Sequence, residues 1–581
     1  MGVSEMLLTH LKIEYYRGIK SLELALGPTT VLVGENNCGK TTVLHALRAC
    51  LQTLRSSGRA SPFDEFDLHF DSKATDPTTA PPIAITLTFE ELTPGEWPEE
   101  VEQKLGGDGG VIALMQPDDR SRIQLRVSAE YSKVTQEIET NFEFLDAAGN
   151  PLPPKNRSRL GSLQQLRPLF YLSALRDAGK EFSRTSQFWS PFVKNSQIDE
   201  TTKADIEQQL EAINTQIIEA HGTFKGVREH LGKVQELVAL GGQDVVSVDA
   251  VPARVFDMLN RTHVSIASAT GARLPIGRHG EGTQSLTVLM LFDAFLKSEL
   301  ARKQGVKESK PIVALEEPEA HLHPNAVRAL WKTIDDIDGQ KLVATHSGDL
   351  LSEVDVYSIR RLYKKGMNVQ VGSLQAGIMD ERQMQKFDHF VRRTRGELFF
   401  ARVWILVEGE TDVIILSGAA RVLGVDLEQS AVRLVEYAQV GLSTFIAAAD
   451  ALGIAWHVFS DGDDAGRKAE RIVRDALKGR SEVDHLTLLP NGEPMEPYLC
   501  RNGFIDIYEL HANEQKRQLH ITVSKEDDAY PVQLYKCLPN NGKPSAAHAV
   551  VAKMQRDGAA TIPEVITNCL KTVMALAGGK L

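Results

Sequence analysis

A glycine-rich loop near the start of the chain constrains the fold more than any other feature. The loop Gly34-Glu-Asn-Asn-Cys-Gly-Lys-Thr41 follows an apolar run, TTVLV, and precedes a helical pattern, TTVLHAL. A GxxxxGK[ST] loop between a strand and a helix wraps phosphates with backbone N–H groups, and the helix N-terminus adds positive charge. We therefore predict an ATP site in which Lys40 reaches the β- and γ-phosphates and Thr41 ligates Mg²⁺. The predicted ATP-binding residues are Gly34, Asn36, Asn37, Gly39, Lys40, Thr41 and Thr42.

A later strand ends in two adjacent carboxylates. The stretch PIVALEEPEAHLHP, residues 311–324, is an apolar strand followed by Glu316 and Glu317. We expect Glu316 to hold Mg²⁺ through water and Glu317 to polarise the attacking water, because only one carboxylate of such a pair sits on the metal. His321 and His323 lack further ligands at suitable spacing, so we interpret them as loop residues rather than a metal site.

Two weaker motifs accompany these. Gly280, Gly282 and Ser285 precede the apolar helix LTVLMLFDAFL, so they mark a second helix start suited to phosphate. The strand KLVATHS ends at His346, where a switch histidine would contact the γ-phosphate. The order of the four motifs along the chain is that of an ABC-type ATPase.

A second acidic pattern lies in the last third of the chain. The apolar strand 403–407 leads into Glu408-Gly-Glu410-Thr-Asp412, and a later strand leads into Asp461-Gly-Asp463-Asp464. Adjacent parallel strands would bring these carboxylates to one edge of a sheet, in a pocket suited to hard divalent cations with oxygen ligands. A calcium loop of the EF-hand type is excluded because its further ligands are missing.

Taken together, these motifs resemble known families. The first half is similar to the RecF, Rad50 and SMC branch of ABC ATPases, and a Glu on one strand with DxD on the next resembles the Toprim signature. An ABC head fused in front of a Toprim domain resembles the OLD (overcoming lysogenization defect) nucleases, over nearly the whole chain. The resemblance implies an α/β fold: an ABC-type ATPase with a helical arm insertion, followed by a Toprim (Rossmann-like) domain.

The resemblance also implies roles for individual residues. Two heads sandwich ATP in the ABC branch, so Gly280, Gly282 and Ser285 would serve the P-loop of a partner subunit. Glu496 matches the later acidic residue of the OLD family and Lys543 its catalytic lysine, although NGK is also a common turn. Glu410, Ser460 and Asp464 are secondary candidates. The implied catalytic residues are Glu317, His346, Glu408, Asp461, Asp463 and Lys543, and the implied metal ligands are Thr41, Glu316, Glu408, Asp412, Asp461, Asp463 and Glu496.

The implied activity is that of an ATP-hydrolysing, metal-dependent DNA endonuclease or nickase, acting in anti-phage defence or DNA metabolism. Its cofactors would be ATP and Mg²⁺, with Mn²⁺ or Ca²⁺ as alternatives at the Toprim site. One cation would activate water and another would stabilise the leaving oxygen, with Lys543 neutralising transition-state charge. Two alternatives stay open: a DNA-repair or SMC-like ATPase whose Toprim domain does not cleave, and a nuclease activated only by a partner subunit.

Pattern shifts along the 581 residues predict four segments. Residues 199–239 have charged helical periodicity, which fits a surface helix pair or a dimerisation arm equally well. The predicted segments are an N-terminal ATPase lobe at 1–180, a helical arm at 181–262, a C-terminal ATPase lobe at 263–390 and a Toprim domain at 391–581.

The composition of the chain limits which binding partners and which cellular compartment we expect for the protein. The net charge of −12 argues against a generally basic nucleic-acid coat, although a local groove can still hold phosphates. Five scattered cysteines give no disulfide framework or zinc site, and no apolar run is long enough to span a membrane, so we expect a cytoplasmic protein. The expected partners are DNA, a second copy or a tetramer assembled through the ATPase half, and a helicase or reverse transcriptase. Arg392, Arg393, Arg395, Arg467 and Lys468 are candidates to grip phosphates, or are simply a solvated surface run.

Overall fold

The P-loop strand lies in the middle of a six-stranded sheet in the computed structural model, with β12 and β13 on either side of it. Strands β3, β11, β12 and β13 run parallel, and β14 pairs antiparallel with β13. The sheet order is β14 (Asn368–Gly372), β13 (Ile359–Lys365), β3 (Thr29–Val33), β12 (Gln340–Ala344), β11 (Ile312–Glu316) and β8 (Leu169–Leu172). The structure describes residues 6–53, 61–71, 76–173, 198–223, 250–252, 254–259, 265–267, 273–302, 310–539 and 542–579.

The parallel strands of this sheet are almost continuously buried. Val31, Leu32 and Val33 of β3 have no exposed surface, and the first four residues of β11 are equally buried. Strands covered on both faces are apolar throughout instead of alternating. Polar side chains therefore collect where the strands end, and that is where the P-loop and Glu316 lie.

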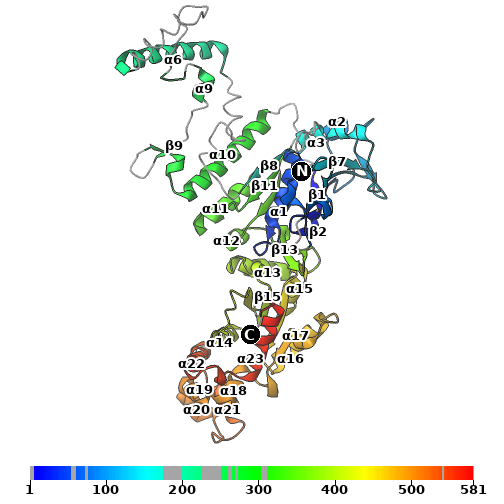
Figure 1. Cartoon of the computed structure of the whole chain (residues 1–581). Helices are drawn as coiled ribbons and strands as arrows, with labels where there is room; N and C mark the ends of the chain where they lie inside the picture. Colours follow the sequence, from blue (N-terminus) through cyan, green and yellow to red (C-terminus); the bar gives the residue numbers. More distant parts are fainter. Residues whose placement is uncertain are drawn as a thin grey trace, which may run out of the picture. The chain divides into compact units, whose positions relative to one another are not determined.

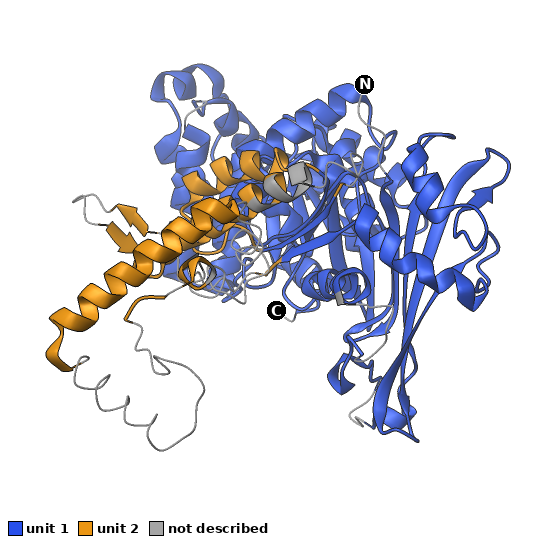
Figure 2. Cartoon of the chain, turned by 90° about the horizontal axis from the view of Figure 1, so that it is seen from above, with its two compact units in different colours: residues 1–171, 311–316, 339–581 blue, residues 172–310, 317–338 orange. Residues whose placement is uncertain are grey.

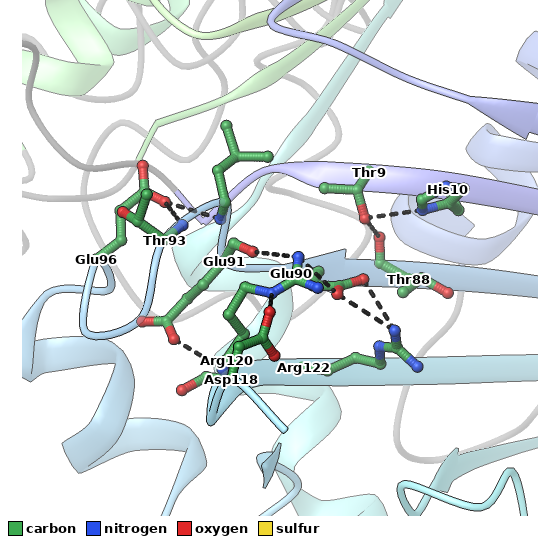
Figure 3. Close-up of polar contacts among 12 residues, drawn as sticks. Thr9, His10, Thr88, Glu90, Glu91, Thr93, Glu96, Asp118, Arg120 and Arg122 are labelled. Carbon is green, nitrogen blue, oxygen red and sulfur yellow. Dashed lines mark hydrogen bonds and ion pairs between the residues drawn. The ribbon is translucent and has the colours of Figure 1, made fainter. Parts of the chain in front are cut away.

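A second, antiparallel sheet is formed largely from the first 145 residues, and its edge is held by a polar cluster (Figure 3). Arg120 and Arg122 of β6 both pair with Glu90 at 3.2 Å. The Glu91 carboxylate accepts hydrogen bonds from the backbone N–H groups of Trp97 and Ser121. These bonds hold the backbone in place just after β4. The strands are β1 (Leu8–Tyr16), β2 (Ile19–Ala25), β4 (Ile83–Glu90), β5 (Ala113–Met115), β6 (Arg120–Ser132) and β7 (Glu137–Leu145).

The chain forms two compact units, coloured separately in Figure 2. The first contains residues 1–171, 311–316 and 339–581, and the second contains residues 172–310 and 317–338. In the second unit, the described residues of the predicted arm, 181–262, form two helices, α6 and α9, whereas residues 181–197, 224–249, 253 and 260–262 lie outside the described part. The described elements of this unit are α6 (Glu200–Ala220), α9 (Val255–Leu259), β9 (Ser265–Ala267), β10 (Arg273–Pro275), α10 (Glu281–Arg302) and α11 (Pro324–Asp335).

The last part of the first unit is built on a four-stranded parallel sheet in the order β16-β15-β17-β18. Figure 1 labels β15 among the helices of this part. The predicted adjacency of the two acidic strands is confirmed, because β15 pairs directly with β17. The strands are β15 (Val403–Val407), β16 (Val432–Glu436), β17 (Ala455–Ser460) and β18 (Leu486–Leu488).

Helices surround this sheet, and the apolar faces of several of them join one core with β15. They are α13 (Glu381–Arg393), α14 (Glu410–Val422), α15 (Leu442–Leu452), α16 (Asp464–Ala476), α17 (Glu482–His485), α18 (Met495–Leu499), α19 (Ile505–His511), α20 (Glu514–His520), α21 (Tyr530–Lys536), α22 (Gly542–Asp557) and α23 (Glu564–Leu576). The remaining helices of the first unit are α1 (Lys40–Arg48), α2 (Glu99–Leu105), α3 (Leu160–Leu166) and α12 (Gly348–Leu351). None of the described helices combines the length and apolarity needed to cross a membrane.

A buried arginine joins the two parallel sheets of the first unit. Arg361 of β13 is 2% exposed, and burial lowers its pKa to about 10. Its guanidinium donates to the carbonyl oxygens of Phe399 and Ala401, before β15, and to those of Leu452 and Gly453, at the end of α15, over 2.6–3.2 Å. A Cβ on Gly453 would lie 2.2 Å from the ring of Tyr363, so only glycine permits this approach.

The burial of His457 predicts a pH dependence of stability. His457 of β17 is fully buried between the carbonyl oxygen of Asp484 and the hydroxyl of Thr487, and burial lowers its pKa to about 4 from the usual 6.5. Between pH 6.5 and 4 the unfolded chain binds a proton here that the folded chain does not, so stability falls as pH falls, by up to about 3 kcal/mol.

Urea unfolding followed by tryptophan fluorescence at pH 7 and pH 4.5 measures this effect. His457→Gln should reduce the loss of stability between the two pH values, whereas a matched change at the exposed His520 should not. An equal loss in wild type and His457→Gln would contradict the prediction.

Candidate functional site

The P-loop joins β3 to α1, and its glycines stand where other residues would clash. Gly34 has φ 140°, and a Cβ there would lie 2.1 Å from the carbonyl oxygen of Leu362. Gly39 has φ 102° and precedes the first residue of α1, Lys40. The amino group of Lys40 donates to the carbonyl oxygens of Gly34 and Glu35 at 2.8 and 2.9 Å. The loop therefore surrounds the amino group of Lys40. Phosphate oxygens would compete with the two carbonyl oxygens for its hydrogen bonds.

Thr41 and Glu316 meet although 275 positions separate them in sequence. The Thr41 hydroxyl donates to one carboxylate oxygen of Glu316 at 2.5 Å, and the Tyr171 hydroxyl donates to the other at 2.7 Å. Burial and the bond to Glu316 raise the pKa of Tyr171. A hydroxyl and a carboxylate at the end of parallel strands are the protein oxygens that suit Mg²⁺ beside nucleotide phosphates. The predicted metal pair of the ATP site is thus brought together, with Tyr171 as a support that the motifs did not reveal.

The other predicted residues of the ATPase half lie at strand and helix ends. Glu317 directly follows β11 and has φ 42°, an uncommon conformation for a residue with a side chain. His346 is exposed just after β12, with its ring stacked on Phe400 at 6.5 Å between centroids. Thr345, immediately before it, donates its N–H to the carbonyl oxygen of Leu32 in β3, so this loop starts beside the P-loop strand.

The predicted signature residues lie in the second unit, at the start of α10. Gly280 is exposed, Gly282 is half-buried and Ser285 is buried. A Cβ on Gly282 would lie 2.8 Å from the carbonyl oxygen of His321, and the His321 ring contacts the Glu281 carboxylate at 2.9 Å. His323 caps α11 through its ring. Both histidines thus have structural contacts, as their interpretation as loop residues predicts.

The acidic residues of the last part gather at the C-terminal edge of its sheet. Glu408 follows β15, and Asp461 follows β17 next to it. Asp463 caps α16 by accepting the N–H groups of Ala465 and Gly466, and Asp412 in the first turn of α14 accepts the N–H of Gly409. Their positions are fixed by backbone contacts, because each helix begins where its strand ends. The secondary candidates Glu410 and Asp464 are the first residues of α14 and α16.

These carboxylates perturb one another. Burial, reinforced by the charges of Asp412, Glu496 and Glu408, raises the pKa of Asp461 to about 8. Burial likewise raises the pKa of Asp412 to about 7, with Glu408 and Glu496 adding to it. The pKa of Glu408 is raised by burial and by Asp463, while Lys543 opposes the rise. Burial and the mutual repulsion of these carboxylates therefore favour their protonated forms.

Lys543 supplies positive charge to this cluster. Its amino group lies 3.3 Å from a carboxylate oxygen of Glu496, which is 5% exposed, and 3.0 Å from the hydroxyl of Tyr535. The hydrogen bond to Tyr535 and the charge of Glu496 raise the pKa of Lys543 against the opposing effect of burial. The two positions identified only through the family resemblance therefore contact each other and act electrostatically on the strand-end carboxylates.

The donor set fits a divalent cation in chemistry but not in its present side-chain arrangement. All the donors are oxygens, and one carboxylate oxygen of Asp461 is buried without a hydrogen-bond partner. Yet within the described ranges no three His, Cys, Asp or Glu side chains converge closely enough to hold a metal ion. The mutual effects on pKa show that these carboxylates lie near one another, so Glu408, Asp461 and Asp463 are the residues that would hold a cation.

Not all of the basic candidates are available to phosphates. Arg392 pairs with Asp388 at 2.8 Å and Arg395 approaches Asp349 at 3.7 Å, so their charges are partly satisfied within the chain. Arg393 donates to the side-chain oxygen of Gln439 at 3.0 Å. Arg467 and Lys468 are exposed in the first turn of α16, beside Asp463.

Comparisons with known proteins agree with this geometry. Residues 6–397 match the family described as "Protein of unknown function (DUF2813)", and residues 399–463 match the TOPRIM domain of overcoming lysogenization defect protein-like sequences. An uncharacterized protein of Escherichia coli, YbjD, is 27% identical over 99% of this chain and all of its own length. The OLD nuclease of Thermus scotoductus is 25% identical over 79% of this chain and 82% of its own, and the endonuclease GajA of Bacillus cereus is 21% identical over 83% and 81%.

Solved structures cover the two parts separately. An SMC head bound to a winged-helix domain of ScpA covers 64% of this chain and 98% of its own, at 14% identity and a TM-score of 0.36. The C-terminal region of an OLD protein from Burkholderia pseudomallei covers 31% of this chain and 99% of its own, at 21% identity and a TM-score of 0.26. The chain belongs to the DUF2813 family, and its P-loop part is followed by a segment, residues 399–463, that matches the OLD-like Toprim domain.

Proposed function

We propose that the chain is an ATP-hydrolysing, divalent-metal-dependent DNA endonuclease or nickase. The observation that carries the proposal is the acidic edge of β15 and β17, which holds Glu408, Asp461 and Asp463 and where the charge of Lys543 acts on Glu408. Relatives over about four fifths of the chain are named as nucleases, which supports the same reaction class. The physiological role we propose is anti-phage defence or DNA metabolism.

Hydrolysis of a phosphodiester needs negative charge to be balanced as it develops on the phosphate oxygens. Divalent cations, Mg²⁺ or alternatively Mn²⁺ or Ca²⁺, would activate water and stabilise the leaving oxygen when bound among the carboxylates. The Lys543 ammonium would balance charge on the phosphate from the Glu496 side. Asp463 and Asp412 would be held in place by the hydrogen bonds that they accept from backbone N–H groups. The fold would therefore restrict their side chains before a cation binds.

The ATPase half would bind ATP through the P-loop. Lys40 would exchange its loop carbonyl partners for phosphate oxygens, and Thr41 with Glu316 would hold Mg²⁺. Glu317 would act as base and His346 would contact the γ-phosphate. We further propose a homodimer or homotetramer through the ATPase half, in which Gly280, Gly282 and Ser285 face a partner's P-loop, with residues 181–262 as the arm; a helicase or reverse transcriptase would be a further partner.

One observation favours a second function, that of an SMC-like ATPase whose Toprim domain does not cleave. No three of the described carboxylates converge on a common point as they stand. In that function the acidic edge would be structural, and neutralising it would relieve repulsion and stabilise the domain. The two functions therefore predict opposite consequences for Asp461, whose neutralisation either abolishes an activity or only changes stability.

The ATPase site is tested by Lys40→Ala and Glu317→Gln. Lys40→Ala should lower ATP binding and abolish turnover, because the loop loses its phosphate-facing charge. Glu317→Gln should bind ATP normally but hydrolyse it at least about a hundredfold more slowly, because the base is lost. Phosphate release and radiolabelled ATP binding measure both, with Lys20→Ala, a change at a half-buried lysine of β2, as a control. Normal turnover in either variant would remove that residue from the site.

The nuclease site is tested by cleavage of supercoiled plasmid with Mg²⁺ or Mn²⁺, with and without ATP. Asp461→Asn keeps the shape of the side chain and removes its charge, so nicking and linearisation should fall at least about a hundredfold. Asp475→Asn, an exposed change on α16, serves as the matched control, and chelation of the metal should stop cleavage by wild type. If Asp461→Asn cuts as fast as wild type, the nuclease site lies elsewhere; if wild type cuts under no condition, the non-cleaving function replaces this one.

A further inference from the structure

A basic groove lies beside the acidic edge, along helix α13. It encloses about 400 Å³, and its lining includes Arg382, Lys386, His389, Phe390 and Arg393 from the helix and Gln439 from the loop between β16 and α15. None of the lining residues is acidic. In a chain of net charge −12, such a groove is a local reversal of the average field.

Helical periodicity places the basic side chains on one face. Residues 382, 386, 389 and 393 follow the spacing of neighbouring positions on a helix surface. The buried side of the helix packs on the Toprim domain: Phe387, and Phe390 at the border of the groove, are in edge-to-face contact with Phe445 of α15. The stripe is thereby held rigidly on the domain that carries the acidic edge.

The described residues supply no carboxylate to neutralise the two outer cations of the groove. Arg382 and Lys386 are exposed, and among the described residues neither has a carboxylate partner within ion-pair distance. The neighbouring Arg392, which points out of the groove, does have one in Asp388. A cationic stripe that the fold leaves without carboxylates has the chemistry that recognises phosphate groups.

The loop after β16 connects the groove to the acidic edge. Tyr437 lies at the acidic side, with its hydroxyl 3.5 Å from that of Ser460, the residue before Asp461. Two residues later, Gln439 lines the groove and accepts a hydrogen bond from Arg393. Two residues of extended chain span at most about 7 Å, so the groove begins within a few nucleotide steps of the carboxylates.

We propose that this groove holds the sugar–phosphate backbone of the DNA whose strand enters the Toprim site. The inference rests on the proposed function, because it names where that site's substrate is gripped. Arg382 and Lys386 bind phosphates outside the scissile position, and Gln439 orders Arg393 at the end nearest the carboxylates. The grip is independent of sequence, since the contacts reach phosphates rather than bases.

Charge reversal of the groove provides the test. The full-length double variant Arg382→Glu/Lys386→Glu is compared with wild type for binding of a short fluorescent DNA duplex, by anisotropy over a range of salt concentrations with metal chelated. Affinity should fall at least about tenfold, and the slope of log K against log salt should fall by about 2, one for each lost phosphate contact. The matched control is Lys364→Glu/Lys365→Glu, which makes the same charge change on exposed lysines of β13. Thermal unfolding confirms that both variants fold.

The DNA-binding measurement tests the groove, and the plasmid-cleavage measurement tests the proposed nuclease function, so the two can fail separately. Equal affinity and equal salt slope in the groove variant and wild type would overturn the groove, even if wild type cuts plasmid. An equal loss in the control variant would also overturn it, because the effect would then be one of net charge. Selective loss in the groove variant supports the groove even if wild type fails to cut, in which case only the proposed cleavage falls.

An ion pair connects the P-loop to the start of β15. Glu35 inside the P-loop forms a two-point ion pair with Arg402, at 2.5 and 2.6 Å. Arg402 is the residue before β15, and its backbone bonds to Ala431 beside β16 and to Ala455 of β17. The pair lowers the pKa of Glu35, as expected for a carboxylate held against a guanidinium.

The same loop residue also holds Lys40, through its carbonyl oxygen. A phosphate that draws Lys40 away from the carbonyls of Gly34 and Glu35 acts on the residue whose side chain grips Arg402. The structure assigns to the Glu35–Arg402 pair the transmission of nucleotide occupancy to β15, the strand that ends at Glu408. This second inference also rests on the proposed function.

Arg402→Gln removes the ion pair without touching either site. Plasmid cleavage without nucleotide and ATP hydrolysis should stay within about twofold of wild type, whereas the ratio of cleavage rates with and without ATP should move toward one. Arg433→Gln, which loses ion pairs to Glu397 and Glu428 on the same sheet, is the matched control and should keep the wild-type ratio. A wild-type ratio in Arg402→Gln, or no effect of ATP on wild type, would overturn the inference.

Discussion

The structure of the first unit depends on the burial of one charge, that of Arg361. A guanidinium removed from water is costly unless its donors are satisfied, and here four carbonyl oxygens accept from it. Two of these oxygens belong to the segment before β15 and two to the end of α15, so the arginine can be satisfied only if both segments stay against β13. Because this one side chain must keep its hydrogen-bond partners, it holds the P-loop sheet against the Toprim sheet more firmly than apolar contact alone would.

This joint places the ends of strands in a definite relation. Arg361 lies opposite Val33 in the register of β13 with β3, and the P-loop starts at the next residue, Gly34. The segment that accepts from Arg361 continues into Arg402, which pairs with Glu35. The phosphate loop therefore meets the beginning of β15, whereas Glu408 stands at the end of the same strand. The P-loop and the acidic edge are separated by the length of one short, fully buried strand.

Much of the site followed from the sequence, because its parts are local or topological. The P-loop is a contiguous motif, and the meeting of Thr41 with Glu316 follows from parallel strands ending at one edge. The same reasoning predicted that β15 and β17 would be neighbours. The sequence did not predict the hydrogen bonds of Arg361 or the contact of Tyr171 with Glu316. No spacing rule links these residues to their partners. The contact of Lys543 with Glu496 was accessible only through the family resemblance, because the two residues lie on separate helices of an irregular region.

The basic groove shows how a charge count can mislead. The candidates Arg392, Arg393 and Arg395 are close in sequence. Two of them form ion pairs within the chain, Arg392 with Asp388 and Arg395 with Asp349. Arg382 and Lys386 are further apart in sequence but lie on one helix face, and the described part of the chain gives them no carboxylate. A net charge of −12 opposes the approach of DNA, so the DNA that we propose as substrate would reach the carboxylates only where that field is locally reversed. The side chains that matter for such a surface are those that the fold leaves unneutralised, and helical phase together with acidic neighbours decides which they are.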